Sequence, residues 1–221
     1  MSGPNNNQVK EEFKKKLSAI SHVYIMAQEA YLYTEYFHNP NTKEELDFVV
    51  KSNQLRMIMH LMFRTMVNEV SKLFSYSQND KYRLMGLVKS LSNDGYYGKL
   101  GMSMQYIQAW EQEFIDNKEI IDNILILRNK VYAHTDSSLI DYNEIDITFK
   151  QIKILLGLAD DIIKKLYILI FDTGLDSTSP TFDKERFILL KLMVKGENQR
   201  QEELLDNAKK MIDEIHNKLQ G

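Results

Sequence analysis

The chain has 221 residues, and its composition favours a helical protein with a buried core. Hydrophobic residues make up 43% of the sequence, whereas 9 glycines and 3 prolines are too few for the many turns of an all-β sandwich or barrel. A net charge of −3 excludes a global basic field, so any contact with RNA would need a local basic patch. The absence of cysteine excludes disulfides and thiolate metal sites.

The sequence shows neither an export signal nor a membrane-spanning pattern. Residues 1–8 are polar and lead directly into charged residues, without the apolar segment of a secretory signal. The most apolar long window, residues 152–171, carries Asp160, Asp161 and Lys164 near its middle, which a membrane-spanning helix tolerates poorly. We therefore expect a cytoplasmic protein that does not enter a membrane.

Apolar residues recur every three or four positions along most of the chain, which predicts an all-α protein. Breakers such as His38-Asn39-Pro40 end the first helix, and Asn41 or Thr42 can cap the second. Helices are expected over residues 9–37, 42–75, 81–91, 103–114, 118–134, 143–171, 182–195 and 197–219.

These helices predict an up-and-down bundle with extra helices at its C-terminal end. We expect a disordered tail at residues 1–8, a bundle at 9–172 and a linker at 173–181. Residues 182–221 form a predicted helical extension, whose last part is strongly charged with a sparse apolar seam. This extension is expected to pack on the bundle or on a partner.

The helix predicted at 118–134 carries two polar interruptions of its apolar stripes. At 100° per residue, Arg128 falls in line with Ile121 and Leu125, whereas His134 continues the line of Leu127. Both side chains are thus directed toward packed surface, where an unpaired cation or imidazole carries a desolvation cost. We expect them to be paired or to bind an anion.

The spacing between Arg128 and His134 keeps them apart on a single helix. Six residues separate them by about 120° around an ideal helix and by roughly 9 Å along it. A joint role requires either that the helix loosens near its end or that two copies face each other across a symmetry axis. In a symmetric dimer, both residues of both chains would enter one groove.

Such a groove suits RNA cleavage through the ribose 2′-hydroxyl. His134 can act as general base or acid near neutral pH, and Arg128 can hold the phosphate and stabilise charge on its oxygens. This reaction needs no metal and no cofactor.

Four neighbouring residues are candidates for a supporting role. Asn129 can orient the phosphate or His134, Lys130 adds positive charge, and Tyr132 can stack on a base. Asp136 can orient His134, although a turn-forming aspartate is an equally good interpretation.

The run Ile126–Asp136, ILRNKVYAHTD, resembles the signature of the HEPN superfamily. That signature is an Arg, often followed by a polar residue, then a His after four to six intervening residues, and this chain has five. The run is most similar to the abortive-infection branch related to AbiU. The resemblance implies a helical bundle, dimerisation along the motif helix and metal-independent endoribonuclease activity, with Arg128, Asn129 and His134 as the matching positions.

The same resemblance implies a role in phage defence or as a toxin, with RNA as substrate and an antitoxin or nucleotidyltransferase as a further partner. The alternative is a non-catalytic dimeric module that binds a nucleotide or a protein. A separate alternative gives both residues a structural role only, in which Arg128 would pair with Asp122 or Glu119 and His134 would interact with the helix dipole.

Other polar residues have simpler interpretations. The pairs Glu35/His38 and Asp213/His216 have the spacing of half a di-iron motif, but the further inward glutamates are not evident, so we expect no metal. His22 and His60 are expected in the core or at an interface. Lys14-Lys15-Lys16 is expected to be a solvated helix face, with guidance of RNA as the alternative.

Two further sets are interpreted in the same way. The aromatic residues Tyr24, Tyr31, Tyr33, Tyr36 and Phe37 are expected to pack in the core rather than to stack on bases. Glu69 and Lys72, on the second long helix, are open candidates for lining the groove.

Overall fold

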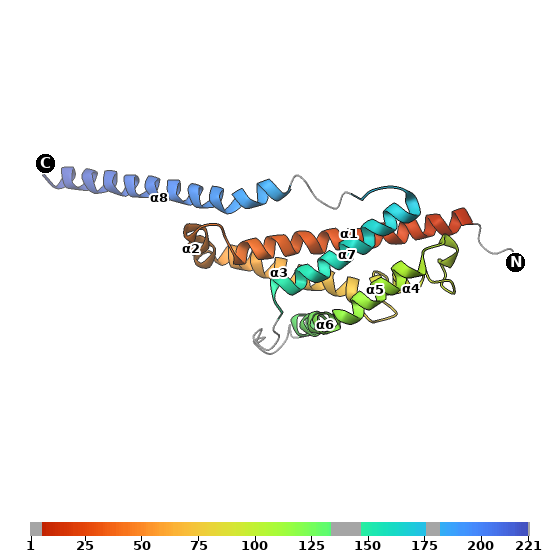
Figure 1. The fold of residues 1–221 in the computed structure, drawn as a ribbon. Helices are drawn as coiled ribbons and strands as arrows, with labels where there is room; N and C mark the ends of the chain where they lie inside the picture. Colours follow the sequence, from red (N-terminus) through yellow and green to blue (C-terminus); the bar gives the residue numbers. More distant parts are fainter. Residues whose placement is uncertain (1–5, 134–146, 176–181, 221) are drawn as a thin grey trace. The chain divides into compact units, whose positions relative to one another are not determined.

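The computed structural model describes residues 6–133, 147–175 and 182–220, and these residues are mostly α-helical (Figure 1). No strand occurs among them, which confirms the predicted all-α class. The elements are α1 (Asn6–His38), α2 (Lys43–Lys51), α3 (Asn53–Phe74), α4 (Leu84–Lys89), the 3-10 helix η1 (Gly98–Leu100), α5 (Met104–Asp116), α6 (Lys118–Ala133), α7 (Phe149–Phe171) and α8 (Phe182–Gln220).

The chain forms two compact units, and their boundaries fall inside helices. The first unit contains α1 up to Glu35, α3 from Ile58, and α4 to α7. The second contains the end of α1, α2, the start of α3, and α8. This division cuts through the region that the sequence predicted as one bundle, because α2 pairs with α8.

A serine divides the second predicted helix into α2 and α3. Ser52 adopts an extended conformation, with φ −88° and ψ 112°. Its hydroxyl accepts a hydrogen bond from the N–H of Leu55 at 3.2 Å, so it caps α3 while its own N–H still donates to Phe48. The prediction of one helix over 42–75 was therefore wrong, whereas the Thr42 cap is confirmed by its 3.2 Å bond from the N–H of Glu45.

Three other helix boundaries differ from the prediction. Helix α1 begins at Asn6, so the last three residues of the expected tail are helical. Helix α7 begins at Phe149 because Thr148 and Gln151 form a reciprocal capping box, and the predicted cap Asn143 lies outside the described residues. Helix α4 begins at Leu84 rather than near 81.

The C-terminal extension is a single helix. Two helices were expected, because Gly196 interrupts the pattern, but α8 continues through it. A glycine in an exposed helix lowers helix stability by about 1 kcal/mol without ending the helix.

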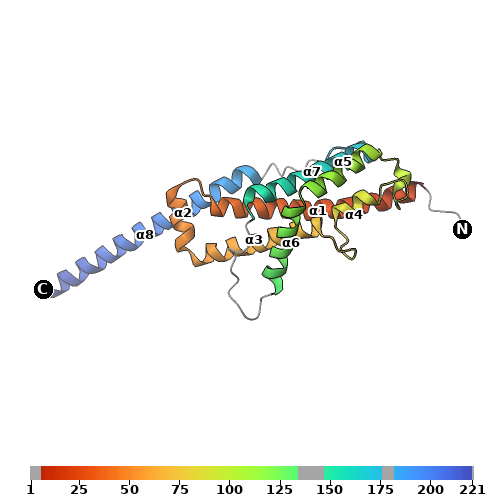
Figure 2. The ribbon, with the colours of Figure 1, turned by 60° about the horizontal axis from the view of Figure 1, so that its bottom comes forward.

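One hydrophobic core joins the helices of the first unit. Phe13 of α1 is fully buried; its ring meets Tyr97 edge-on, with ring centroids 5.0 Å apart, and stacks near Phe171 of α7 at 6.2 Å. Helix α6 runs across the direction of α1 and α3 (Figures 1 and 2) and contributes Ile121, Ile124 and Leu127 to the same core. The register of α6 is therefore set by burial of one apolar face.

The aromatic residues near the end of α1 are confirmed as packing residues. Tyr24 and Tyr31 are buried in the first unit, and Tyr36 and Phe37 in the second, whereas Tyr33 is half-buried. In the second unit, the Tyr36 hydroxyl accepts a hydrogen bond from the N–H of Leu190 at 3.3 Å.

Much of α8 exposes apolar side chains. Its exposed residues include Leu192, Leu204, Leu205, Met211, Ile212 and Ile215. Within the described part of the chain, no helix is both long enough and apolar enough to span a membrane.

Replacing Ile124 tests the register of α6. Ile124 is fully buried, so Ile124→Ala should lower the free energy of unfolding by about 2–5 kcal/mol through lost burial and the cavity left behind. Ile126, two residues further along the same helix, is 48% exposed, and Ile126→Ala should change it by no more than about 0.5 kcal/mol. Urea denaturation measures both, and equal losses would contradict this register.

Candidate active site on α6

The first turn of α6 is held by a local charge pair and by a contact from another segment. The Lys118 ammonium lies 2.5 Å from a carboxylate oxygen of Asp122, one turn along the helix. Asp122 also accepts a hydrogen bond from the hydroxyl of Tyr76, which follows the end of α3. This contact ties the start of α6 to the segment after α3.

These contacts change the acidity of both partners. The hydrogen bond from Lys118 lowers the pKa of Asp122, although partial burial opposes that shift. Burial, reinforced by the hydrogen bond to Asp122, raises the pKa of Tyr76 to about 12. At neutral pH, Tyr76 is therefore a hydrogen-bond donor to an ionised carboxylate.

Further along α6, Arg128 is held by its neighbour in the sequence. Its side chain is half-buried, beside the face that buries Ile121 and Ile124. Its Nε and Nη2 lie 3.3 and 3.2 Å from Oδ1 of the exposed Asn129. One amide oxygen thus restrains the guanidinium, whose five N–H donors give it capacity for further acceptors.

The predicted salt bridge of Arg128 is not formed in the described part of the chain. Asp122 is engaged by Lys118 and Tyr76 instead, and Glu119 is exposed at the other end of α6. Among the described residues, no carboxylate pairs with Arg128. The two salt bridges considered for Arg128, with Asp122 and with Glu119, are therefore not formed.

The other predicted site residues are described only in part. Lys130 and Tyr132 lie in α6, but their side chains are outside the description. His134 and Asp136 lie outside the described residues altogether. The helix stays regular from Arg128 to Ala133, so it does not loosen within that interval. The described structure brings together Arg128 and Asn129.

Glu69 and Lys72 of α3 interact with each other. The Lys72 ammonium lies 2.5 Å from Glu69 Oε1, which also accepts a hydrogen bond from the Asn68 side chain at 3.1 Å. Elsewhere, Glu35 accepts a hydrogen bond from Tyr31. Among the described residues, no group of three or more His, Asp or Glu side chains is placed to hold a metal ion.

Two features of the first unit were missed at the sequence level. The Tyr76 contact to α6 joins residues far apart in the chain, and no local pattern indicates it. His22 was expected in the core or at an interface, and it does not lie in the core: it is exposed, because its neighbours Ser21 and Val23 occupy the buried face of α1. His22 instead lines a surface hollow with Lys14, Lys15 and Tyr82.

Comparison with models of protein families gives one match that covers most of the chain. Residues 10–189 match the HEPN family described as AbiU2, and this range includes the whole of α6. Searches of curated proteins and of solved structures found no match.

Replacing Tyr76 tests the contact that holds the start of α6. Tyr76→Phe removes one hydrogen bond and should lower the free energy of unfolding at pH 7 by about 0.5–1.5 kcal/mol. The unfolded tyrosine ionises near 10 and the folded one only near 12, so this contribution is complete below pH 10 and is lost as pH rises toward 12. Urea denaturation at several pH values measures it.

The matched control is Tyr106→Phe, at another exposed tyrosine of the same unit. It should leave the hydrogen bond from Tyr76 to Asp122 in place, together with the pH dependence that this bond gives. If Tyr76→Phe and Tyr106→Phe behave alike between pH 10 and 12, the contact between Tyr76 and Asp122 does not stabilise the protein.

Proposed function

Because the chain belongs to the AbiU2 family of HEPN proteins, we propose that it is a metal-independent endoribonuclease of abortive infection or of a toxin–antitoxin pair. The family match covers the run from Arg128 to His134. RNA is the proposed substrate, and an antitoxin or a nucleotidyltransferase is the proposed regulatory partner when the protein acts as a toxin.

The proposed reaction is an internal transfer at phosphorus. His134 accepts the proton of the ribose 2′-hydroxyl, whose oxygen attacks the adjacent phosphorus while the bond to the 5′-oxygen of the next nucleotide breaks. A protonated imidazole returns a proton to that 5′-oxygen. The products are a 2′,3′-cyclic phosphate and a 5′-hydroxyl, so atoms and charge balance without an added cofactor.

Arg128 supplies the electrostatic part of this proposal, and its environment is the observation that carries it. A half-buried guanidinium is held through Asn129 Oδ1 and pairs with no described carboxylate. Such a cation is suited to a phosphate, which accepts two parallel N–H donors. Asn129 in this role is a positioning residue, because it orients the guanidinium.

We further propose that two chains build the site. Helix α6 is regular from Arg128 to Ala133. Loosening within this described part of the helix therefore does not draw Arg128 toward the end of α6. In a symmetric dimer, Arg128 of one protomer would act with the partner's His134, and that same imidazole, once protonated, would return the proton to the leaving oxygen. Lys130 and Tyr132 would line the same groove.

RNA cleavage in the presence of a metal chelator tests the activity. His134→Ala should lower the rate by about 10²–10⁴-fold through loss of proton transfer. Arg128→Ala should lower it by about 10²–10³-fold through loss of charge stabilisation, and Arg128→Lys should recover only part of this, since a lysine lacks the fork of donors. The products should carry 5′-hydroxyl ends, and RNA with 2′-O-methyl groups should resist cleavage.

Arg200→Ala and His216→Ala are the matched controls, because they remove the same residue types from α8. Both should cleave RNA at the wild-type rate. Equal cleavage by the wild type and His134→Ala would contradict the proposal. So would the absence of cleavage across varied RNAs, which would favour the non-catalytic module that binds a nucleotide or a protein partner.

Mixing two inactive variants tests the shared site. If Arg128 acts with the partner's His134, co-refolded Arg128→Ala and His134→Ala protomers should regain about a quarter of wild-type activity, because about half of the dimers are mixed and each has one complete site. Recovery should require subunit exchange. No recovery after verified exchange would show that each site uses one chain.

A further inference from the structure

Two adjoining hollows lie beside the N-terminal half of α1 in the first unit. They share Lys15, Ala19 and Tyr82, so they are adjacent, and together we call them the α1 trough. The first hollow is lined by Glu11, Lys14, Lys15, Ser18, Ala19, His22, Val23 and Tyr82. The second is lined by Lys15, Lys16, Ala19, Gln78, Asp80, Lys81, Tyr82, Arg83 and Gly86.

The lining of the α1 trough is basic, although the whole chain carries a net charge of −3. Its permanent cations are Lys14, Lys15, Lys16, Lys81 and Arg83. Among the described residues that line it, Glu11 and Asp80 are acidic, and Asp80 already accepts a hydrogen bond from the Ser75 hydroxyl. The trough is therefore a local basic patch. Because the chain as a whole is acidic, contact with RNA would need a patch of this kind.

Lys16 and Arg83 lie close enough to repel each other inside the trough. Burial lowers the pKa of Lys16, and the positive charge of Arg83 lowers it further. Glu12, one turn before Lys16, would be its usual helical partner, but Glu12 accepts a hydrogen bond from the Tyr96 hydroxyl at 2.8 Å. Among the described residues, no carboxylate forms an ion pair with Lys16 or Arg83, so an external anion would relieve their repulsion.

Gly86 allows Arg83 to occupy this position. A Cβ atom at Gly86 would lie 2.5 Å from Arg83 Nε and 2.9 Å from Arg83 Cγ, so the arginine side chain lies against the glycine backbone. A glycine inside a helix is otherwise unfavourable. An alanine here would move the guanidinium without removing its charge.

Tyr82 adds a flat surface to the basic lining. It belongs to both hollows, and it is 38% exposed. Sites for single-stranded nucleic acids combine a positively charged groove, which follows the phosphates, with aromatic rings on which bases stack. A free phosphate or a lipid headgroup has no base, and gives no reason for the aromatic ring.

We propose that the α1 trough binds the phosphate backbone of single-stranded RNA, with a base stacked on Tyr82. This inference rests on the proposed ribonuclease function, because it assigns a substrate-binding surface, on α1 and on the segment that leads into α4, that is separate from the residues of α6. The alternative considered for Lys14-Lys15-Lys16, guidance of RNA, thereby gains a structural basis.

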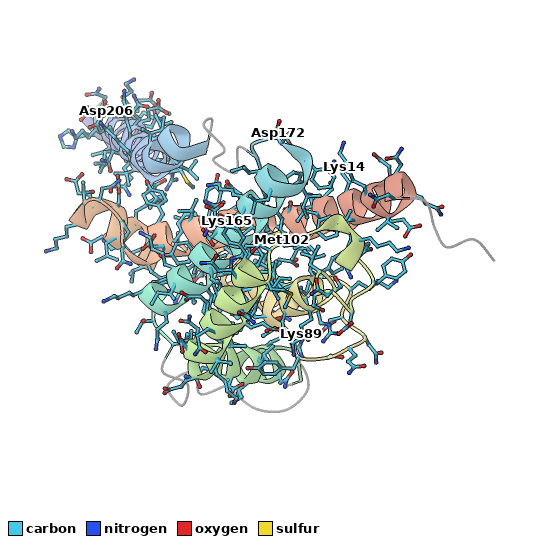
Figure 3. The ribbon with its side chains drawn as sticks, turned by 45° about the vertical axis from the view of Figure 1, so that its right-hand side comes forward. Lys14, Lys89, Met102, Lys165, Asp172 and Asp206 are labelled. Atoms are coloured by element: carbon cyan, nitrogen blue, oxygen red, sulfur yellow. The ribbon has the colours of Figure 1, made fainter. Side chains whose placement is uncertain are left out.

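Binding of a fluorescent single-stranded RNA with 2′-O-methyl groups throughout tests the trough independently of cleavage. Lys15→Gln combined with Arg83→Gln should weaken binding by about 10-fold or more, and should reduce the slope of log K against log salt by about 1.4. The matched control is Lys89→Gln combined with Lys99→Gln, two exposed lysines of the same unit outside the trough. Figure 3 shows Lys14 and Lys89 well apart on the surface of that unit.

Gly86→Ala and Tyr82→Leu separate geometry from charge. Gly86→Ala should weaken RNA binding several-fold while leaving the melting temperature unchanged or higher, since it displaces Arg83 and favours the helix. Tyr82→Leu should weaken binding without changing the salt slope, because it removes stacking and no charge. Both variants should be checked for folding by circular dichroism.

Four outcomes would overturn the inference. They are absence of RNA binding by the wild type at low salt, equal weakening by the trough and control double variants, complete competition by inorganic phosphate at concentrations near those of the RNA, and binding to anionic phospholipid vesicles in place of RNA. If the wild type cleaves RNA while the trough variants bind it normally, the trough inference fails and the proposed function stands. If the trough binds RNA and no RNA is cleaved, the proposed function is contradicted and the inference that the trough binds RNA is retained.

Discussion

Burial of one face of α6 is the constraint on which the candidate site depends. Ile121, Ile124 and Leu127 are at most 2% exposed, and they join α6 to the core of the first unit. Because a helix has a fixed rotation per residue, this burial also fixes the direction of Arg128, at the border between the core and the surface. A cation on the opposite face would be fully hydrated, and one turned further inward would require a buried counter-ion.

The distribution of carboxylates around α6 decides which cations are satisfied. Asp122 is one of the two acidic residues, with Glu119, that the sequence offered to Arg128, but Lys118 and Tyr76 already bind it. Arg128 is then held by the neutral side chain of Asn129, which restrains the guanidinium without cancelling its charge. In the α1 trough, too, a carboxylate is bound by a tyrosine and not by the nearby cation. Glu12 accepts a hydrogen bond from Tyr96, and Lys16 is left with the positive charge of Arg83 beside it.

Local backbone chemistry divides the rest of the chain. Ser52, in the second unit, ends α2 and caps α3 through its hydroxyl, whereas the boundary between the units falls further on, within α3, between Met57 and Ile58. In the second unit, the buried carboxylate of Glu45 accepts a hydrogen bond from the N–H of Asn41 at 3.0 Å, which fixes the entry to α2 beside α8. A serine and a glutamate thus shape a region whose apolar pattern alone reads as continuous helix.

The sequence by itself determined the helical class, most helix positions, a cap at Asn41 or Thr42, and the family, because periodicity, capping residues and the run from Arg128 to His134 are local features of the chain. It could not determine that Ser52 interrupts a helix or that Gly196 does not. At each position, the residue's local preference is of similar strength to the helical hydrogen bonds of its neighbours, so the sequence does not decide the outcome. Only the tertiary structure decided which partner each charge takes. The contacts of Tyr76 with Asp122 and of Tyr96 with Glu12 join residues far apart in the chain, and packing of the helices brings them together.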